Sequence, residues 1–94
     1  MLYKVKDKSM QPNFKEGDFI IVNRLAYIFK KPSIGDVVVV NRSNKIILKR
    51  ITSVSNEKYF VVGDNKIASK DSRSFGTIDK DSIIGKVMFH IKRV

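Results

Sequence analysis

Five short apolar runs recur along the chain, separated by turn signals, at residues 19–22, 37–40, 46–54, 59–62 and 83–91. They are rich in β-branched and aromatic residues and have the length of strands rather than of helices. No segment keeps the i, i+3, i+4, i+7 spacing of an amphipathic helix for long. The pattern predicts an all-β protein, a small coiled sheet or partly open barrel, in which residues 1–94 form a single domain.

Gly-Asp pairs are the clearest turn signals of this predicted sheet. They precede two of the apolar runs, at 17–18 and 35–36, and they follow a third at 63–64. Glycine supplies the positive φ of a tight turn, and an aspartate side chain can hydrogen-bond the nearby backbone. The segment 23–31 stays ambiguous, since it suits either a helical turn or the extension of a hairpin.

The composition is that of a soluble globular protein. Hydrophobic residues make up 43% of the 94 positions, which is too apolar for disorder, and the absence of cysteine excludes disulfides and thiolate metal sites. No apolar run approaches the ~20 residues that span a bilayer, and the first ten residues lack the apolar centre of a secretory signal. We therefore expect a chain that acts at a membrane only from its surface or with help.

The net charge of +10 favours anionic partners, either nucleic acid or acidic lipid headgroups. The basic residues are scattered, however, with short clusters only at 30–31, 49–50 and 92–93, and scattered lysine is typical of a solvated surface. A basic barrel that binds nucleic acid also needs aromatic side chains along one sheet face, whereas the nine here are dispersed. We keep that function as an alternative and expect no nucleic-acid partner.

One lysine occupies an unusual position in the run 46–54. Side chains alternate between the two faces of a strand, so Lys49 shares a face with Ile47 and Ile51. A lysine between two isoleucines is expected to lose water, which lowers its pKa and makes the neutral amine a candidate general base. The alternative is a lysine whose ammonium group extends past the sheet edge to solvent.

A serine near the start of the chain is the candidate nucleophile. Ser9 lies in the stretch KSMQP, where Pro12 fixes its own φ and biases Gln11 towards extended geometry. Such rigidity suits a nucleophile, although a plain loop serine explains the stretch as well. Nothing around His90 resembles a Ser-His-Asp motif, and we expect His90 to be a structural strand residue, so Ser-Lys is the simpler pairing.

Four motifs in order make the chain resemble the type I signal peptidases. Residues 9–12 match the Ser-Met-x-Pro nucleophile motif, and residues 17–40 are similar to a block in which two Gly-Asp turns each precede a strand. Residues 49–50 match a Lys-Arg pair, and residues 63–73 match the signature Gly-Asp-Asn…Ser-x-Asp-Ser-Arg. The resemblance covers residues 5–88, nearly the whole chain.

The resemblance implies a role for each matching residue. Ser9 would attack the scissile carbonyl with Lys49 as its base, Ser69 would orient the lysine amine, and the Ser9 backbone N–H would stabilise the oxyanion. No cofactor or metal is expected. The rest of the polar segment 63–76 would support the site, with an ion pair between residues 71 and 73; its matching residues are Gly63, Asp64, Asn65, Asp71, Ser72 and Arg73.

The chain departs from the family pattern at three points. Asp7 stands where members usually have glycine or serine, and its carboxylate would repel an oxyanion; it would either point away or pair with Lys6 or Lys8. Only residues 50–62 separate Lys49 from Gly63, so the β-domain that larger bacterial members insert there is missing. We expect the family's N-terminal membrane anchors to be missing too. In size the chain resembles soluble proteases that mature nickel-dependent superoxide dismutase.

The function implied is a Ser/Lys endopeptidase that removes an N-terminal signal peptide or pro-segment after small residues at −1 and −3. Pocket residues would be Met10, Ile20 and Val38, although core packing explains them equally well. The apolar stretch 25–29 beside two lysines either docks on an anionic membrane or forms a buried hairpin or a partner contact. The alternatives are a cytoplasmic maturation protease with one substrate and an inactive peptide-binding homologue, and the localisation stays open between membrane surface and cytoplasm.

Overall fold

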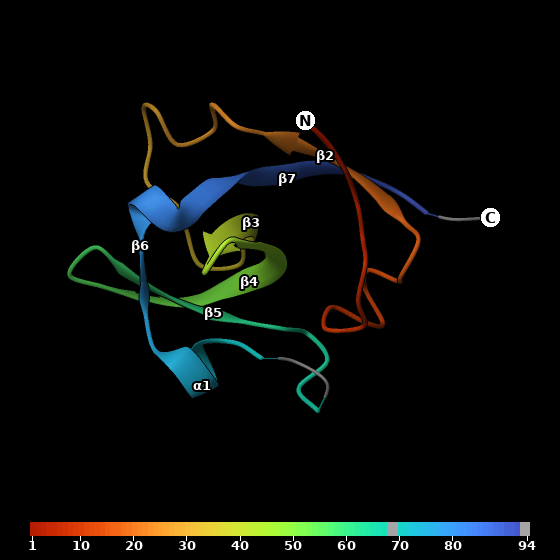
Figure 1. Cartoon of the computed structure of the whole chain (residues 1–94). Helices are drawn as coiled ribbons and strands as arrows, with labels where there is room; N and C mark the ends of the chain where they lie inside the picture. Colours follow the sequence, from red (N-terminus) through yellow and green to blue (C-terminus); the bar gives the residue numbers. More distant parts are fainter. Residues whose placement is uncertain (68–69, 93–94) are drawn as a thin grey trace.

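The computed structural model describes residues 1–67 and 70–92. Within them, seven strands form one open antiparallel sheet in the order β1-β2-β7-β3-β4-β5-β6 (Figure 1). The strands are β1 (Leu2–Lys4), β2 (Phe19–Asn23), β3 (Val37–Arg42), β4 (Lys45–Ser55), β5 (Lys58–Val62), β6 (Ile78–Asp79) and β7 (Ile83–Ile91). A four-residue helix α1 (Ser72–Phe75) and a 3₁₀ turn η1 (Lys80–Ser82) complete the fold. The all-β prediction is confirmed, and all five apolar runs form strands.

The last strand, β7, lies in the middle of the sheet. It pairs with β2 on one side and with β3 on the other, so the strands that flank segment 23–31 are not hydrogen-bonded to each other. The segment therefore does not extend a hairpin. It forms turns, one of them closed by the Ile28 N–H and the Leu25 carbonyl at 3.3 Å.

Register shifts twist the sheet, and buried side chains of the sheet form two separate cores. The shifts lie between Ile21 and Val22 in β2, between Val39 and Val40 in β3 and between Ile51 and Ser53 in β4, and such bulges increase local twist. Val39 points into the first core, whereas Val38 and Val40 point into the second. The run of four valines follows from this arrangement, because both faces of β3 are covered.

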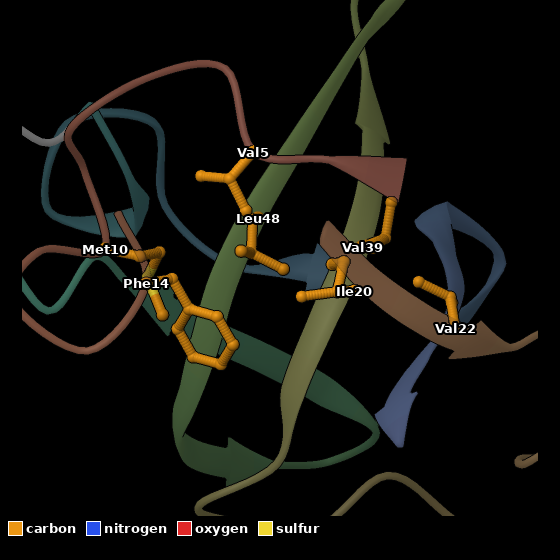
Figure 2. Close-up of a cluster of buried hydrophobic side chains, with 7 residues drawn as sticks. All are labelled: Val5, Met10, Phe14, Ile20, Val22, Val39 and Leu48. Atoms are coloured by element: carbon orange, nitrogen blue, oxygen red, sulfur yellow. The ribbon is translucent and has the colours of Figure 1, made fainter. Parts of the chain in front are cut away.

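The first core fixes the chain segment between β1 and β2. Met10 and Phe14 come from this segment and are buried against Val39 and Leu48 of the sheet (Figure 2). The segment crosses from the level of β2 to the turn that follows β5 (Figure 1). Packing thus holds residues 5–14, which include Ser9, against the sheet.

The first two Gly-Asp turns share one construction. Gly17 has a φ of 95°, and the Asp18 carboxylate accepts the Lys15 N–H at 2.9 Å. Gly35 has a φ of 94°, and the Asp36 carboxylate accepts the Ser33 N–H at 3.1 Å. The expected use of glycine at positive φ is confirmed at both turns, and the aspartates bond backward along the chain.

The helices in the described part of the chain have four and three residues, so neither has the length to cross a bilayer.

Candidate active site

Lys49 lies in the middle of β4, where its backbone faces Val38 of β3. Its side chain is only 2% exposed, on the face of β4 that Ile47 and Ile51 also occupy. The structure therefore favours the buried lysine over one that reaches past the sheet edge to solvent.

The surroundings of Lys49 favour the neutral amine. Burial lowers the pKa of Lys49 below its ordinary value, because the ammonium ion loses its hydration. The Asp7 and Asp71 carboxylates oppose this shift, and the Arg73 guanidinium adds to it, but the pKa stays lowered. A lysine with a lowered pKa can accept a proton at a pH where an exposed lysine cannot.

Ser9 is 3% exposed and lies in a loop that is tied to the turn after β5. The Asn65 N–H donates to the Ser9 carbonyl at 2.8 Å, and the Asn65 side chain donates to the Lys8 carbonyl at 3.0 Å. The Asp64 N–H contacts the Met10 sulfur at 3.4 Å. Residues 8–10 are thus held by two consecutive residues of the polar segment.

The same turn is anchored to the strand of Lys49 through the residue next to it. Arg50 binds the Asp64 carboxylate with two hydrogen bonds of 2.9 Å each, and Asn13 adds a third at 2.8 Å. Burial would raise the pKa of the Asp64 carboxyl, but these hydrogen bonds outweigh it and the pKa is lowered. Because side chains alternate on β4, Lys49 points into the site while Arg50 braces the loop that carries Ser9.

Asp71 organises the other end of the polar segment. It is 1% exposed and caps α1 by accepting the Arg73 N–H at 3.1 Å. It also accepts the Gly63 N–H at 2.8 Å and pairs with the Arg73 guanidinium at 2.8 Å. Ser72 accepts the Val61 N–H at 2.8 Å, so α1 is fastened to β5. The ion pair between residues 71 and 73 is present as expected, and Ser69 lies outside the described residues.

Ser9 and Lys49 open onto the same cleft, which has a volume of about 370 Å³. Its walls include both aliphatic and charged side chains, which are contributed by Asp7, Arg42, Lys45, Ile47, Lys70 and Phe75. The three residues suggested for the substrate pocket lie elsewhere. Met10 and Ile20 are buried in the first core and Val38 in the second, so core packing is the interpretation that the structure supports for them.

Asp7 points at Ser9 rather than away from it. Its Oδ1 accepts the Ser9 hydroxyl at 2.8 Å and the Ser9 backbone N–H at 3.0 Å. Neither Lys6 nor Lys8 forms an ion pair with it in the described part of the chain. The backbone donor expected to stabilise an oxyanion is therefore engaged by a carboxylate in this structure.

His90 lies apart from the cleft. Its Nε2 is 2.7 Å from the Asp18 carboxylate, and its ring packs on Phe14 with centroids 4.4 Å apart. It links β7 to the first Gly-Asp turn, which is a structural role. Among residues 1–67 and 70–92, no three histidine, aspartate or glutamate side chains converge to hold a metal ion.

Several contacts that shape the site were not predicted from the sequence. Arg50 appeared only as part of a motif, yet it forms the brace on Asp64, together with Asn13. The cationic residues of the cleft were also missed. Their signal was present in Arg42 and Lys45, which flank a two-residue turn close in sequence to Lys49.

Comparison with known proteins identifies the class. The family described as signal peptidase, peptidase S26 matches residues 1–54 and 48–92, almost the whole chain. Signal peptidase I V of Bacillus subtilis is 27% identical over 137 aligned residues, covering 90% of this chain and 82% of the relative. Signal peptidase IB of Staphylococcus aureus is 27% identical over 143, covering 93% and 75%. These matches define a serine-type peptidase. The chain belongs to the signal peptidase family, as its motifs suggested.

Both alignments are longer than the 94-residue chain, so the relatives carry residues that face gaps here. The family match is divided at residues 48–54, beside the short connection between Lys49 and Gly63. This division falls next to the place where the sequence predicted a missing insert.

Proposed function

We propose that this protein is a Ser/Lys endopeptidase that removes an N-terminal signal peptide or pro-segment by cutting after small residues at −1 and −3. The observation that carries the proposal is the burial of Ser9 and Lys49 on one cleft, with the lysine pKa lowered. Burying a lysine costs stability, and a lysine with a perturbed pKa in a cleft is a candidate functional group. Family membership supports the same chemistry.

In the proposed mechanism, the Ser9 Oγ attacks the scissile carbonyl while the neutral Lys49 amine takes the hydroxyl proton. The resulting ammonium gives that proton to the leaving amine as the peptide bond breaks. A water molecule then attacks the acyl carbon while Lys49 takes its proton. The bond between the acyl group and Ser9 Oγ breaks, Lys49 returns the proton to Oγ, and the acid product leaves. The brace from Arg50 through Asp64 and Asn65 supports this role, because it holds the nucleophile's loop on the strand that carries the base.

The Ser9 backbone N–H is the proposed oxyanion donor, and Asp7 must move for it to act. At present this N–H donates to the Asp7 carboxylate at 3.0 Å. In the productive complex the substrate carbonyl oxygen would take the place of that carboxylate. Ser69 remains the proposed partner that orients the Lys49 amine.

The pH dependence of cleavage tests the assignment of the base. With a peptide carrying alanine at −3 and −1, kcat should rise with pH through the lowered pKa of Lys49, because only the neutral amine accepts the proton. The rising limb should therefore lie below 10.5, the ordinary value for lysine. Measuring kcat at increased solvent viscosity shows whether product release limits the rate, because only a release-limited kcat falls with viscosity. A flat profile at rates limited by chemistry would exclude Lys49 as the base.

One observation favours a second candidate, an inactive homologue that binds peptides. Asp7 places a negative charge where negative charge would develop during attack, and it engages both polar groups of Ser9. Loss of one oxyanion donor costs about 10²–10³ in rate. Peptide binding without any turnover by the unmodified protein would favour this candidate.

We further propose that an anionic membrane surface is a partner of segment 25–29. Phe29 is 99% exposed, and Leu25 and Ile28 are also exposed, whereas Tyr27 is buried and donates to Asp36 at 2.7 Å. Two exposed lysines follow at 30 and 31. Apolar side chains beside cations suit insertion among acidic headgroups.

Vesicle binding tests this surface. Phe29→Ser should weaken binding to phosphatidylglycerol vesicles by about ten- to a hundredfold, since a buried phenylalanine contributes roughly 1.5–3 kcal/mol. The matched control is Ile67→Ser, which removes an equally exposed apolar side chain from the turn after β5. Equal binding by the two variants would exclude segment 25–29 as the docking site.

A further inference from the structure

The cleft that holds Ser9 and Lys49 has a positively charged end. Every second residue of β4 points to the same face, and on this face Lys45, Ile47 and Lys49 all line the cleft. The cleft therefore follows β4 towards the β3–β4 turn. Arg42 and Lys45 flank this turn, and Lys70 adds a third cation from before α1. Apart from Asp7 at the Ser9 end, no acidic residue of the described chain lines the cleft.

The arrangement at the turn works against folding stability. Arg42 and Lys45 are directly opposite each other in the β3–β4 ladder, and like charges in that position are destabilising. Neither forms an ion pair with a carboxylate of residues 1–67 or 70–92. Like charges placed opposite each other, with no carboxylate of the described residues paired to either, are expected where a surface binds an anionic group.

Two features hold these cations in place. Ser43 and Asn44 have φ values of 51° and 64°, the positive values that a tight two-residue hairpin requires. The Arg42 guanidinium lies 4.0 Å from the centre of the Phe75 ring of α1, a cation–π contact that fixes its position. The charged end of the cleft is therefore built from ordered backbone and a stacked side chain.

We propose that this cationic end is a specificity subsite for acidic residues of the peptide substrate, near the scissile bond. The proposal rests on the proposed peptidase function and names its substrate class more closely. An extended peptide and β4 have the same rise of about 3.3 Å per residue, so Lys45 lies about four peptide positions from Lys49. The length of the cationic side chains brings aspartate or glutamate two to four residues from the cut within reach.

A peptide fits this cleft better than a nucleic acid does. Nucleic-acid grooves combine cations with several aromatic rings on which bases stack. Among the described residues that line the cleft, Phe75 is the one aromatic residue, and its ring already stacks with Arg42. Its other end is formed by Ser9 and Lys49, the groups proposed to act on a peptide bond.

The test compares labelled peptides with alanine at −3 and −1 that carry either two glutamates or two glutamines. One pair has them at −2 and −4 and a second pair at +2 and +3, which identifies the side of the cut that the subsite reads. We expect kcat/KM for one glutamate peptide to exceed that of its glutamine match by about tenfold, since two exposed ion pairs contribute modestly. Added salt should reduce this ratio.

Lys45→Glu should abolish or reverse the preference. This substitution places opposite charges across the hairpin from Arg42, so it is expected to leave folding intact. Lys80→Glu makes the same change in net charge outside the cleft and should keep the preference. A peptide with two lysines in place of the glutamates should be cleaved faster by the Lys45→Glu variant than by the parent protein. A merely structural role of Lys45 would not produce this gain.

Binding measured by fluorescence anisotropy separates this proposal from the peptidase function. Tighter binding of a glutamate peptide without cleavage would overturn the peptidase function and support the acidic subsite. Equal Kd and equal kcat/KM for glutamate and glutamine peptides would overturn the subsite and leave the peptidase intact. A short single-stranded oligonucleotide that binds in a Lys45-dependent manner, with the two peptides equal, would assign the cations to nucleic acid instead.

Discussion

Ser9→Ala is expected to lower kcat/KM for a peptide with alanine at −3 and −1 by about 10³-fold or more, to the level of background hydrolysis. The hydroxyl would form the acyl bond, so nothing replaces it when it is removed. Its loss also removes one hydrogen bond to Asp7, but the backbone N–H bond to the same carboxylate stays. The fold should therefore survive, and peptide binding measured by anisotropy should change little.

Lys49→Met is expected to abolish activity, as Ser9→Ala does, and to increase the stability of the folded protein. The folded pKa of Lys49 lies below its ordinary 10.5, so between these two values the unfolded chain binds more protons than the folded one. Stability therefore rises with pH across that window, and the cost of burying the amine is fully present below it. Methionine removes this cost, so the melting temperature at neutral pH should increase and its pH dependence in the window should disappear.

The two variants together separate catalysis from folding. A protein that is more stable than the parent and inactive cannot owe its inactivity to unfolding. Ser74→Ala is a matched control, since it removes another hydroxyl near the site on α1 and should keep activity. Substantial cleavage by either Ser9→Ala or Lys49→Met would remove the Ser/Lys assignment.

The sequence was sufficient to predict the strands that carry long apolar runs, because β-branched residues on both faces of β3 and β4 leave few alternatives. It did not reveal β1 and β6, which have three and two residues and no apolar alternation of their own. It also did not reveal α1, since this helix depends on the Asp71 carboxylate at its start rather than on helix propensity. Such elements arise from tertiary contacts that no local pattern records.

The burial of the candidate base could be predicted from the sequence, whereas the contacts that hold the site together could not. Period-2 alternation correctly indicated that Lys49 is buried, because Ile47 and Ile51 share its face. Alternation shows which face of a strand a side chain occupies, but not what covers that face. The sequence therefore did not decide whether Met10 and Ile20 line a substrate pocket or a core, and the structure places both in the first core. The brace between Arg50 and Asp64 joins strand β4 to the turn after β5, so it follows only from the three-dimensional structure.

Asp7→Gly is expected to raise kcat by about 10²-fold and to move the pH profile to lower values. The carboxylate holds the Ser9 N–H at 3.0 Å, and a freed oxyanion donor is worth about 10²–10³ in rate. Its negative charge also raises the pKa of Lys49, so removal makes the amine neutral at a lower pH. The rising limb of the profile should shift in that direction.

Asp7→Asn separates the two effects, because asparagine keeps an acceptor for the Ser9 N–H but carries no charge. It should shift the pH profile as Asp7→Gly does and leave the plateau of kcat near that of the parent. Lys8→Gly controls for backbone freedom in the same loop. A fall in kcat with both Asp7 variants would mean that the carboxylate is needed to orient the Ser9 hydroxyl at 2.8 Å, and the oxyanion donor would then have to be sought elsewhere in the cleft.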